Sequence, residues 1–371
     1  MEMQNSILDK VISSKKSAEM EQFNPTEIVS SLLKNLTSRE EDVLRRRHGL
    51  LGKEKETLEN IGGSYNVTRE RIRQIEKTAI NKIKKYKGFS ENSGSIERTI
   101  FSVLEQHGGI MSEDSLLKEL LTVPGNNMIN RQNIIFITSE LLDSKFKKIK
   151  EDVEYRDSWQ LINAPMYLLK ESLNILINFI EKYGQPMTLE EIISEFKKAE
   201  YYKNNLEQFS DDVIGSYLEI SPKISKNPFN EYGLSSWGSV VPKRMNDKIY
   251  LVLKRHGKPM HFNEITKEIN EVKFDNRKAY PPTVHNELIL NNKYVLVGRG
   301  IYALKEWGYQ PGVVANVLVQ ILKDESEPLT REELVKKVLE QRIVKKNTIH
   351  LALTNKDRFQ KLSDGRFKLV E

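Results

Sequence analysis

The clearest periodic pattern of the chain lies between Thr57 and Lys85, where a short turn separates two helical periods. Leu58, Ile61 and Tyr65 fall on one face of the first period. The second period carries a longer apolar stripe at helical spacing, formed by Ile72, Ile75, Ala79 and Ile83. This pattern predicts two amphipathic helices joined as a helix-turn-helix.

Capping and turn residues stand at the ends of both predicted helices. Thr57 and Thr68 are favourable N-cap residues. Asn66 lies where the chain must turn, and asparagine tolerates the left-handed conformation better than most residues. Gly63 is expected to weaken the first helix by roughly 1 kcal/mol relative to alanine.

The polar face of the second helix carries side chains that can read base edges. Arg69 can pair with guanine, Glu70 with cytosine and Gln74 with adenine. Cations suited to the sugar-phosphate backbone follow on the same helix: Lys77, Lys82, Lys84 and Lys85. We therefore expect this helix to enter the DNA major groove. The alternative is a solvated charged helix that only packs on its apolar stripe.

Residues 36–50, 57–62 and 67–76 together resemble region 4 of the sigma-70 family, over about residues 25–86. That resemblance implies recognition of a promoter −35 element and docking on the β-flap of bacterial RNA polymerase. It implies base reading by Arg69, Glu70 and Gln74, and backbone contacts by Thr57, Thr68, Arg71 and Arg73. The surface of the 36–50 helix would meet the flap. Asn66 departs from the glycine that is common in the turn.

The N-terminal extension, residues 1–24, is polar and short. A housekeeping sigma factor carries aromatic-rich regions before region 4 that melt promoter DNA. We therefore do not expect this chain to open a promoter by itself.

The rest of the chain contains a weak internal repeat with a period of roughly seventy residues. The sequence pattern of each repeat predicts a helix, a short β-like dipeptide, two helices and two strands. The dipeptides begin at Ile110, Pro186, Pro259 and Pro328. Each repeat closes on an aromatic strand, and this plan predicts four winged helices. The third resembles the HARE-type winged helix of the RNA polymerase delta subunit, which implies attachment to the transcription machinery or to DNA.

The predicted fold is mainly α with small β-wings. The helix-turn-helix domain covers residues 25–88, and a Gly/Ser-rich linker at 89–95 should be flexible. Residues 309–312 should form a second linker. The winged helices are predicted at 96–165, 166–241, 242–309 and 312–371. Because the linker looked flexible, residues 1–88 and 95–371 should fold independently.

Composition favours an intracellular binding protein over an enzyme. The net charge is +6 and there is no cysteine, which excludes disulfides and thiolate metal sites. No apolar run approaches membrane-spanning length, so we expect a cytoplasmic protein without a membrane partner. The histidines other than His48 are scattered without a ligand spacing: His107, His256, His261, His285 and His350. We expect no metal, no cofactor and no small-molecule substrate.

The sequence therefore predicts a DNA-binding transcription factor whose partners are double-stranded DNA and bacterial RNA polymerase. The alternative is a polymerase-binding interaction protein, delta-like or competing with a sigma factor, whose winged helices bind protein. A third reading is an accessory to DNA defence or DNA modification. A second DNA contact is predicted in the fourth repeat. Its candidate residues are Lys345, Lys346, Asn347, Thr348 and His350, with Arg366 and Lys368 on the following wing.

Overall fold

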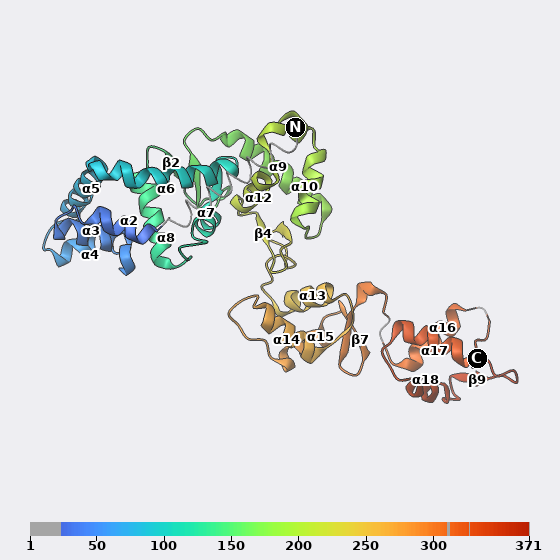
Figure 1. Ribbon diagram of the computed structural model, residues 1–371. Coiled ribbons are helices and arrows are strands. Elements are labelled where there is room, and N and C mark those ends of the chain that lie inside the picture. Colours follow the sequence, from blue (N-terminus) through green and yellow to red (C-terminus); the bar gives the residue numbers. More distant parts are fainter. Residues whose placement is uncertain (1–23, 310–311, 326, 371) are drawn as a thin grey trace. The chain divides into compact units, whose positions relative to one another are not determined.

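The computed structural model describes residues 24–309, 312–325 and 327–370 (Figure 1). Apart from Asn24, the predicted N-terminal extension lies outside these ranges. The chain is mainly helical with small sheets, as its pattern predicts. It divides into two compact units. The first ends at Ser225 and also holds Tyr232–Leu234; the second holds Lys226–Glu231 and the residues from Ser235 onward.

The helix-turn-helix domain opens the first unit. It consists of α2 (Pro25–Leu33), α3 (Ser38–His48), the 3-10 turn η1 (Leu50–Gly52), α4 (Leu58–Ser64) and α5 (Arg69–Lys85). Thr37 and Glu40 form a capping box that fixes the start of α3. Gly49 ends α3 at a φ of 69°, where a side chain would be strained.

The segment predicted as a flexible linker is helical instead. Residues 89–95 lie inside α6 (Lys87–Gln106), which follows α5 after Tyr86. Further along α6, Ile96 and Ile100 are buried in the same apolar core as Leu32 of α2 and Ile83 of α5. Tertiary burial thus outweighs the weak helix propensity of the Gly and Ser residues. The helix-turn-helix domain and the first repeat share one core.

The first repeat builds a three-stranded sheet beside its helices. After α6 come β1 (Ile110–Ser112), α7 (Glu113–Leu120), α8 (Met128–Phe136), the π-turn η2 (Ile137–Leu141), β2 (Phe146–Ile149) and β3 (Ser158–Leu161). The antiparallel strands are ordered β1-β3-β2. Helix α8 packs on the helix-turn-helix domain, where the Thr26 hydroxyl donates to Asn130 Oδ1 at 2.7 Å and the ring of Phe136 lies 4.8 Å from that of His48.

The second repeat has the same order of elements. It contains α9 (Met166–Tyr183), α10 (Leu189–Lys198), α11 (Glu200–Asn204), the turn η3 (Leu206–Gln208), α12 (Asp211–Ile220), β4 (Ile224–Lys226) and β5 (Tyr232–Leu234). Its short first strand is a single bridge between Met187 and Tyr232. The division between the units runs through this hairpin, not at the predicted boundary after residue 241. Phe229 at the hairpin tip belongs to the second unit and packs there on Phe274, with ring centroids 6.0 Å apart.

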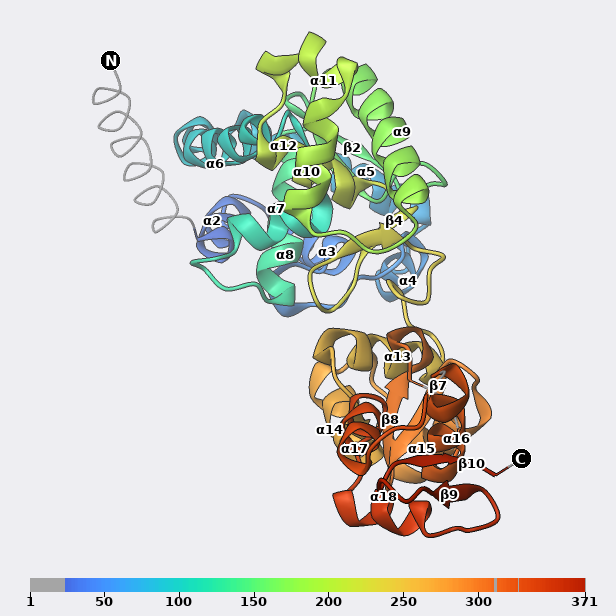
Figure 2. The same cartoon turned by 90° about the vertical axis from the view of Figure 1, so that its right-hand side faces the viewer.

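The second unit contains the other two repeats (Figure 2). The third consists of α13 (Met245–His256), β6 (Met260–His261), α14 (Phe262–Val272), α15 (Pro281–Leu290), β7 (Tyr294–Gly298), β8 (Ile301–Leu304) and the turn η4 (Lys305–Trp307). The fourth consists of α16 (Val314–Asp324), α17 (Arg331–Gln341), α18 (Lys346–Leu353), β9 (Phe359–Lys361) and β10 (Phe367–Leu369). The third has a sheet ordered β6-β8-β7, whereas the fourth pairs β9 with β10.

The predicted linker between these two repeats is only partly described, since residues 310 and 311 lie outside the described ranges. The fourth repeat nevertheless contacts the third directly. The Ile343 amide donates to the Val297 carbonyl at 2.9 Å, which places the segment before α18 against β7. Such a contact covers an edge strand that would otherwise expose unpaired backbone groups.

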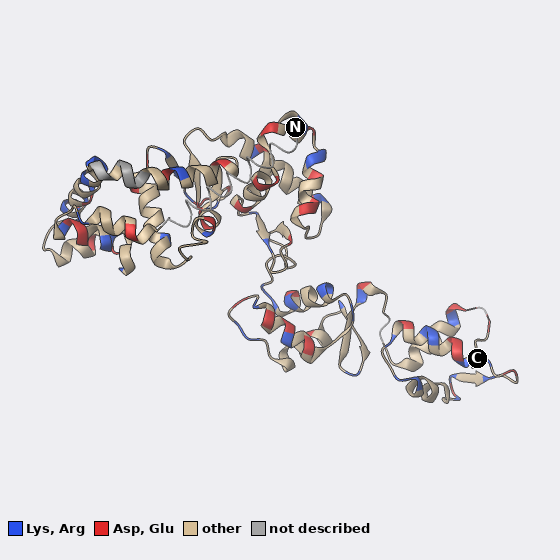
Figure 3. Ribbon diagram, viewed as in Figure 1, with Lys and Arg blue, Asp and Glu red and all other residues tan. Residues whose placement is uncertain are grey.

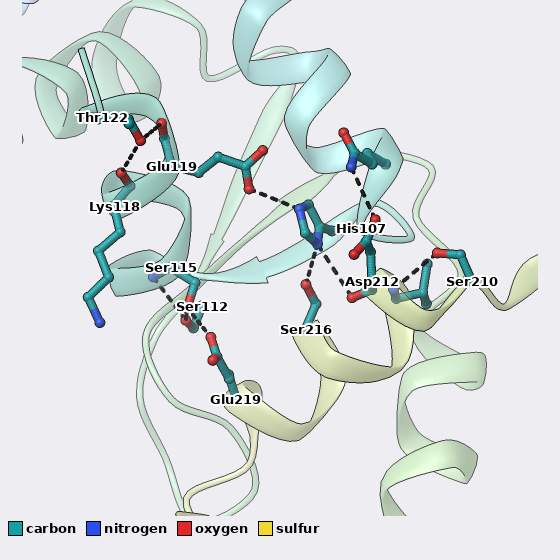
Figure 4. A network of polar contacts seen from close by, with 12 residues as sticks. His107, Ser112, Ser115, Lys118, Glu119, Thr122, Ser210, Asp212, Ser216 and Glu219 are labelled. Atoms are coloured by element: carbon teal, nitrogen blue, oxygen red, sulfur yellow. Dashed lines mark hydrogen bonds and ion pairs between the residues drawn. The ribbon is translucent and has the colours of Figure 1, made fainter. Parts of the chain in front are cut away.

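A polar cluster joins the first repeat to the second. His107, at the end of α6, lies between Glu119 of α7 and Ser216 of α12 (Figure 4). Its Nε2 is 2.9 Å from a Glu119 carboxylate oxygen, and its Nδ1 is 2.7 Å from the Ser216 hydroxyl. Burial alone would lower the pKa of His107, but the hydrogen bond and charge of Glu119, helped by Asp212, outweigh burial and raise the pKa.

This raised pKa makes the stability of the first unit depend on pH. The contribution of His107 is fully present below its unfolded pKa of about 6.5 and is lost as the pH rises through the raised folded value. The difference in unfolding free energy between the native chain and His107→Gln should therefore shrink over that window in urea denaturation. Glu119→Gln should abolish or reverse this pH dependence, because burial, which lowers the pKa of His107, is then no longer outweighed by Glu119. A difference that stays constant with pH would contradict this account.

Candidate nucleic-acid interface

The turn between α4 and α5 is built by local caps and one close backbone approach. The Thr57 and Thr68 hydroxyls accept the amides of Asn60 and Arg71, each at 3.2 Å, which confirms both predicted N-caps. Asn66 adopts a φ of 51°, the left-handed conformation that the sequence predicted. The Val67 amide then donates to the Gly62 carbonyl at 3.0 Å and closes the turn.

A small apolar core holds α5 against α3 and α4. Val43, Ile61 and Ile72 are fully buried there, one from each helix. Partly buried side chains surround them: Leu58, Tyr65, Val67 and Ile75. The predicted stripe is therefore the inner face of α5, although Ile75 is only half-buried. Ile80, which the sequence analysis left out of the stripe, is also buried, and it packs in the core shared with the first repeat.

The opposite face of α5 is exposed and polar, and Figure 3 marks the Lys, Arg and Glu positions along this helix. The side chains predicted to read bases or contact phosphates at its first turns all lie there: Arg69, Glu70, Arg71, Arg73, Gln74 and Lys77. Two pairs organise this face. Arg73 donates two hydrogen bonds to Glu70, at 2.8 and 2.7 Å, and Arg71 donates to Gln74 at 3.2 Å. The hydrogen bond from Arg73 lowers the pKa of Glu70, so this acid is ionised at neutral pH. Among the described residues, Arg69 and Lys77 have no hydrogen-bond or ion-pair partner.

Two of the lysines at the basic end of α5 form ion pairs within the protein, which the sequence did not predict. The Lys82 ammonium lies 2.6 Å from a carboxylate oxygen of Glu40 on α3, and that of Lys84 lies 2.6 Å from Asp143 after η2. Burial alone would raise the pKa of Glu40, but its hydrogen bonds with Lys82 and Thr37 outweigh burial and lower the pKa. Lys85 is exposed and contacts no acid within the described chain.

A polar brace that the sequence analysis missed fixes α3 against the turn. Arg46 donates two hydrogen bonds of 2.7 Å to Glu56 and a third of 2.7 Å to the Ser64 hydroxyl. Asp42 accepts from the Tyr65 hydroxyl at 2.8 Å. The hydrogen bonds from Arg46 lower the pKa of Glu56, and Glu56 in turn raises that of Arg46. A bidentate arginine pair has the geometry to hold a loop in register.

The second set of predicted DNA contacts lies in the other compact unit. Lys345 to Thr348 are exposed at the start of α18. Arg366, on the hairpin that follows, is paired with Asp364 at 2.7 Å, and this hydrogen bond raises its pKa.

Across residues 24–309, 312–325 and 327–370, no cluster of three or more His, Asp or Glu side chains could hold a metal ion. In the same residues, no helix combines the length and the apolar character that a membrane crossing requires.

One part of the chain is similar to a known protein family. The family described as Sigma-70, region 4, matches residues 32–85. The sigma factor SigA of Nostoc sp. (strain PCC 7120) is 52% identical over 58 residues, and RpoD of Helicobacter pylori (strain 26695) is 53% identical over 57 residues. SigA of Clostridium acetobutylicum is 55% identical over 53 residues.

The matches to these relatives are short. They cover 16%, 15% and 14% of this chain and 15%, 8% and 14% of the three sigma factors, in the same order. The four repeats lie outside the matched residues 32–85. Residues 32–85 are therefore a domain of the sigma-70 region 4 kind.

Proposed function

We propose that this protein is a sigma-like DNA-binding transcription factor. It recognises promoter-type DNA through its helix-turn-helix and associates with bacterial RNA polymerase in the cytoplasm. The observation that carries the proposal is the exposed face of α5. Its six polar side chains stand on the second helix of a helix-turn-helix, in a segment more than half identical to three RNA polymerase sigma factors.

In this proposal Arg69, Glu70 and Gln74 read base edges. Arg69 has no described partner to give up, so it is ready to make a bidentate contact with guanine. On binding DNA, Arg71 would leave Gln74 and Arg73 would leave Glu70, and both arginines would bind phosphate oxygens instead. The Gln74 amide is then free to pair with adenine, and the Glu70 carboxylate with cytosine. Thr57 and Thr68 use hydroxyl lone pairs as caps, so each O–H remains able to donate to a phosphate. Lys77 and Lys85 would add phosphate contacts.

We further infer that the four repeats are winged helices. Each has the helix, short strand or bridge, paired helices and hairpin of that fold. The helix before the hairpin differs between repeats. In the fourth repeat it begins with Lys346, Asn347 and Thr348, which suits a second DNA contact.

The third repeat favours the alternative function, a polymerase-binding interaction protein, for that part of the chain. Its corresponding helix, α15, contains no Lys or Arg. Leu290 and Ile289 on that helix are 82% and 60% exposed. An exposed apolar surface without cations suits a protein better than a phosphate backbone. This agrees with the attachment role implied by the HARE-type resemblance of the third repeat.

For the helix-turn-helix domain, we propose that the surface of α3 contacts the β-flap of the polymerase.

Two assays test the proposal together. Selection from a pool of random duplexes with the intact chain should enrich one motif, and co-purification with core RNA polymerase should retain the chain. If a DNA motif is enriched but the chain is not retained by the polymerase, the proposed association with RNA polymerase is wrong. Retention without enrichment would favour the interaction protein, and the absence of both would end the proposal.

The salt dependence of DNA binding should separate the lysines of α5. Lys85→Ala should reduce the slope of log affinity against log salt concentration by about one unit, because each phosphate contact releases about one counterion. Lys82→Ala should reduce it by less, since the Lys82 ammonium is already bound by Glu40. Equal slopes for Lys85→Ala and the native chain would show that Lys85 merely solvates the helix.

A further inference from the structure

A groove in the fourth repeat is bordered only by uncharged and basic side chains. It has a volume of about 690 Å³ and opens between the start of α17, the second half of α18 and the β9–β10 hairpin. That volume lies within the range of binding pockets, roughly 300–1,000 Å³. Among the described residues that line the groove there is no Asp or Glu.

The floor of the groove is apolar. Leu353, Phe359 and Phe367 belong to the buried core and keep only 5%, 3% and 4% of their surface exposed there, so Val370 beside them, 43% exposed, offers most of the accessible apolar surface. A partner with apolar side chains would remove this surface from water, which stabilises the complex. The outside of a DNA duplex presents sugars and phosphates, which cannot use such a floor.

The rim of the groove is basic, and its basic side chains are available. Arg331 begins α17, His350 lies on α18, Lys356 follows α18, and Lys361 ends β9. None of the four forms a hydrogen bond or ion pair with another residue in the described part of the chain. By contrast, Arg366 nearby is held by Asp364. Unpaired cations around an apolar floor are complementary to a ligand that combines negative charges with large apolar groups.

We propose that this groove binds an acidic segment of a partner protein, in which Asp and Glu alternate with Leu or Phe. The apolar side chains enter the groove and the acids pair with the rim. Of the predicted DNA contacts of this repeat, Lys345 to Thr348 lie at the start of α18 and do not line the groove, so the two functions share only His350 among the residues of this helix. The proposal does not rest on DNA binding by α5.

The test uses the intact chain and three short fluorescein-labelled peptides in an anisotropy titration. One peptide alternates acids with Leu and Phe, the second replaces the acids by Lys, and the third replaces Leu and Phe by Ser and Gln. A labelled duplex forms a fourth arm. We expect only the first peptide to bind tightly, and its affinity to fall as salt is added.

Charge reversal at the rim should weaken that binding. Lys356→Glu combined with Lys361→Glu should lower the affinity for the acidic apolar peptide by about tenfold or more, because repulsion replaces attraction. Both side chains are exposed, so the fold should survive. Lys336→Glu, an exposed lysine of α17 outside the groove, should change the affinity little. Binding of the third peptide as tight as the first, or an unchanged affinity of the rim variant, would overturn the proposal. So would a rim variant that loses only duplex binding.

Discussion

Replacing Gly62 by alanine is expected to destabilise the helix-turn-helix by about 1–3 kcal/mol, the usual cost of overpacking a close contact. A Cβ at this position would lie 2.7 Å from the Val67 carbonyl oxygen, far inside ordinary contact distance. That oxygen belongs to the backbone of the turn and cannot rotate away. The turn would have to open, and α5 would shift relative to α3. Denaturation of the intact chain and DNA binding should both report the change.

The neighbouring glycine provides a matched control. A Cβ at Gly63 would meet no atom within 4 Å, and the residue is exposed on the same helix. Gly63→Ala should therefore stabilise the chain by about 0.5–1 kcal/mol, since alanine is the better helix former. If Gly62→Ala proved as stable as Gly63→Ala, the close approach of Gly62 to the Val67 carbonyl could not be what constrains the turn.

Truncation at residue 88 is expected to abolish cooperative folding of the sigma-like domain. The core of that domain continues into the first repeat, where Ile100 and Phe136 pack in one cluster with Leu32 and Ile83. Without α6 and α8 this apolar surface faces water. Each core side chain that loses its surroundings costs about 2–5 kcal/mol, and a domain has only 5–15 kcal/mol to lose.

Urea denaturation followed by circular dichroism compares two fragments. Residues 1–234, which span the first unit, should unfold in one sharp transition, and residues 1–88 should show a broad one. A sharp transition of the shorter fragment, with the midpoint of the longer one, would support the independent domains expected from the sequence.

Local signals explain which parts of the fold the sequence predicted. The N-caps at Thr57 and Thr68 and the left-handed Asn66 depend on residues within a few positions, so they can be recognised in the sequence. The same is true of the order of elements in each repeat, which follows from periodicity.

Long-range packing explains what the sequence did not predict. The Gly/Ser-rich stretch within residues 89–95 suggested a flexible linker, yet it lies in a helix that is anchored by buried residues further along, such as Ile100. The pairing of Lys84 with Asp143 joins residues 59 positions apart, which composition cannot show. The brace of Arg46 on Glu56 depends equally on how the turn folds back on α3. The basic rim of the groove in the fourth repeat forms only where α17, α18 and the β9–β10 hairpin come together, so it could not be recognised in the sequence.

Binding of Arg69→Ala to two duplexes tests the central claim, base reading by α5, most directly. One duplex carries the motif selected by the intact chain, and the other is a scrambled duplex of the same length. The account predicts a loss of about 1–3 kcal/mol on the selected duplex and a much smaller loss on the scrambled one. Arg98→Ala, which removes the same charge from an exposed position of α6, should leave the ratio of the two affinities unchanged. Equal losses of Arg69→Ala on both duplexes would contradict the claim.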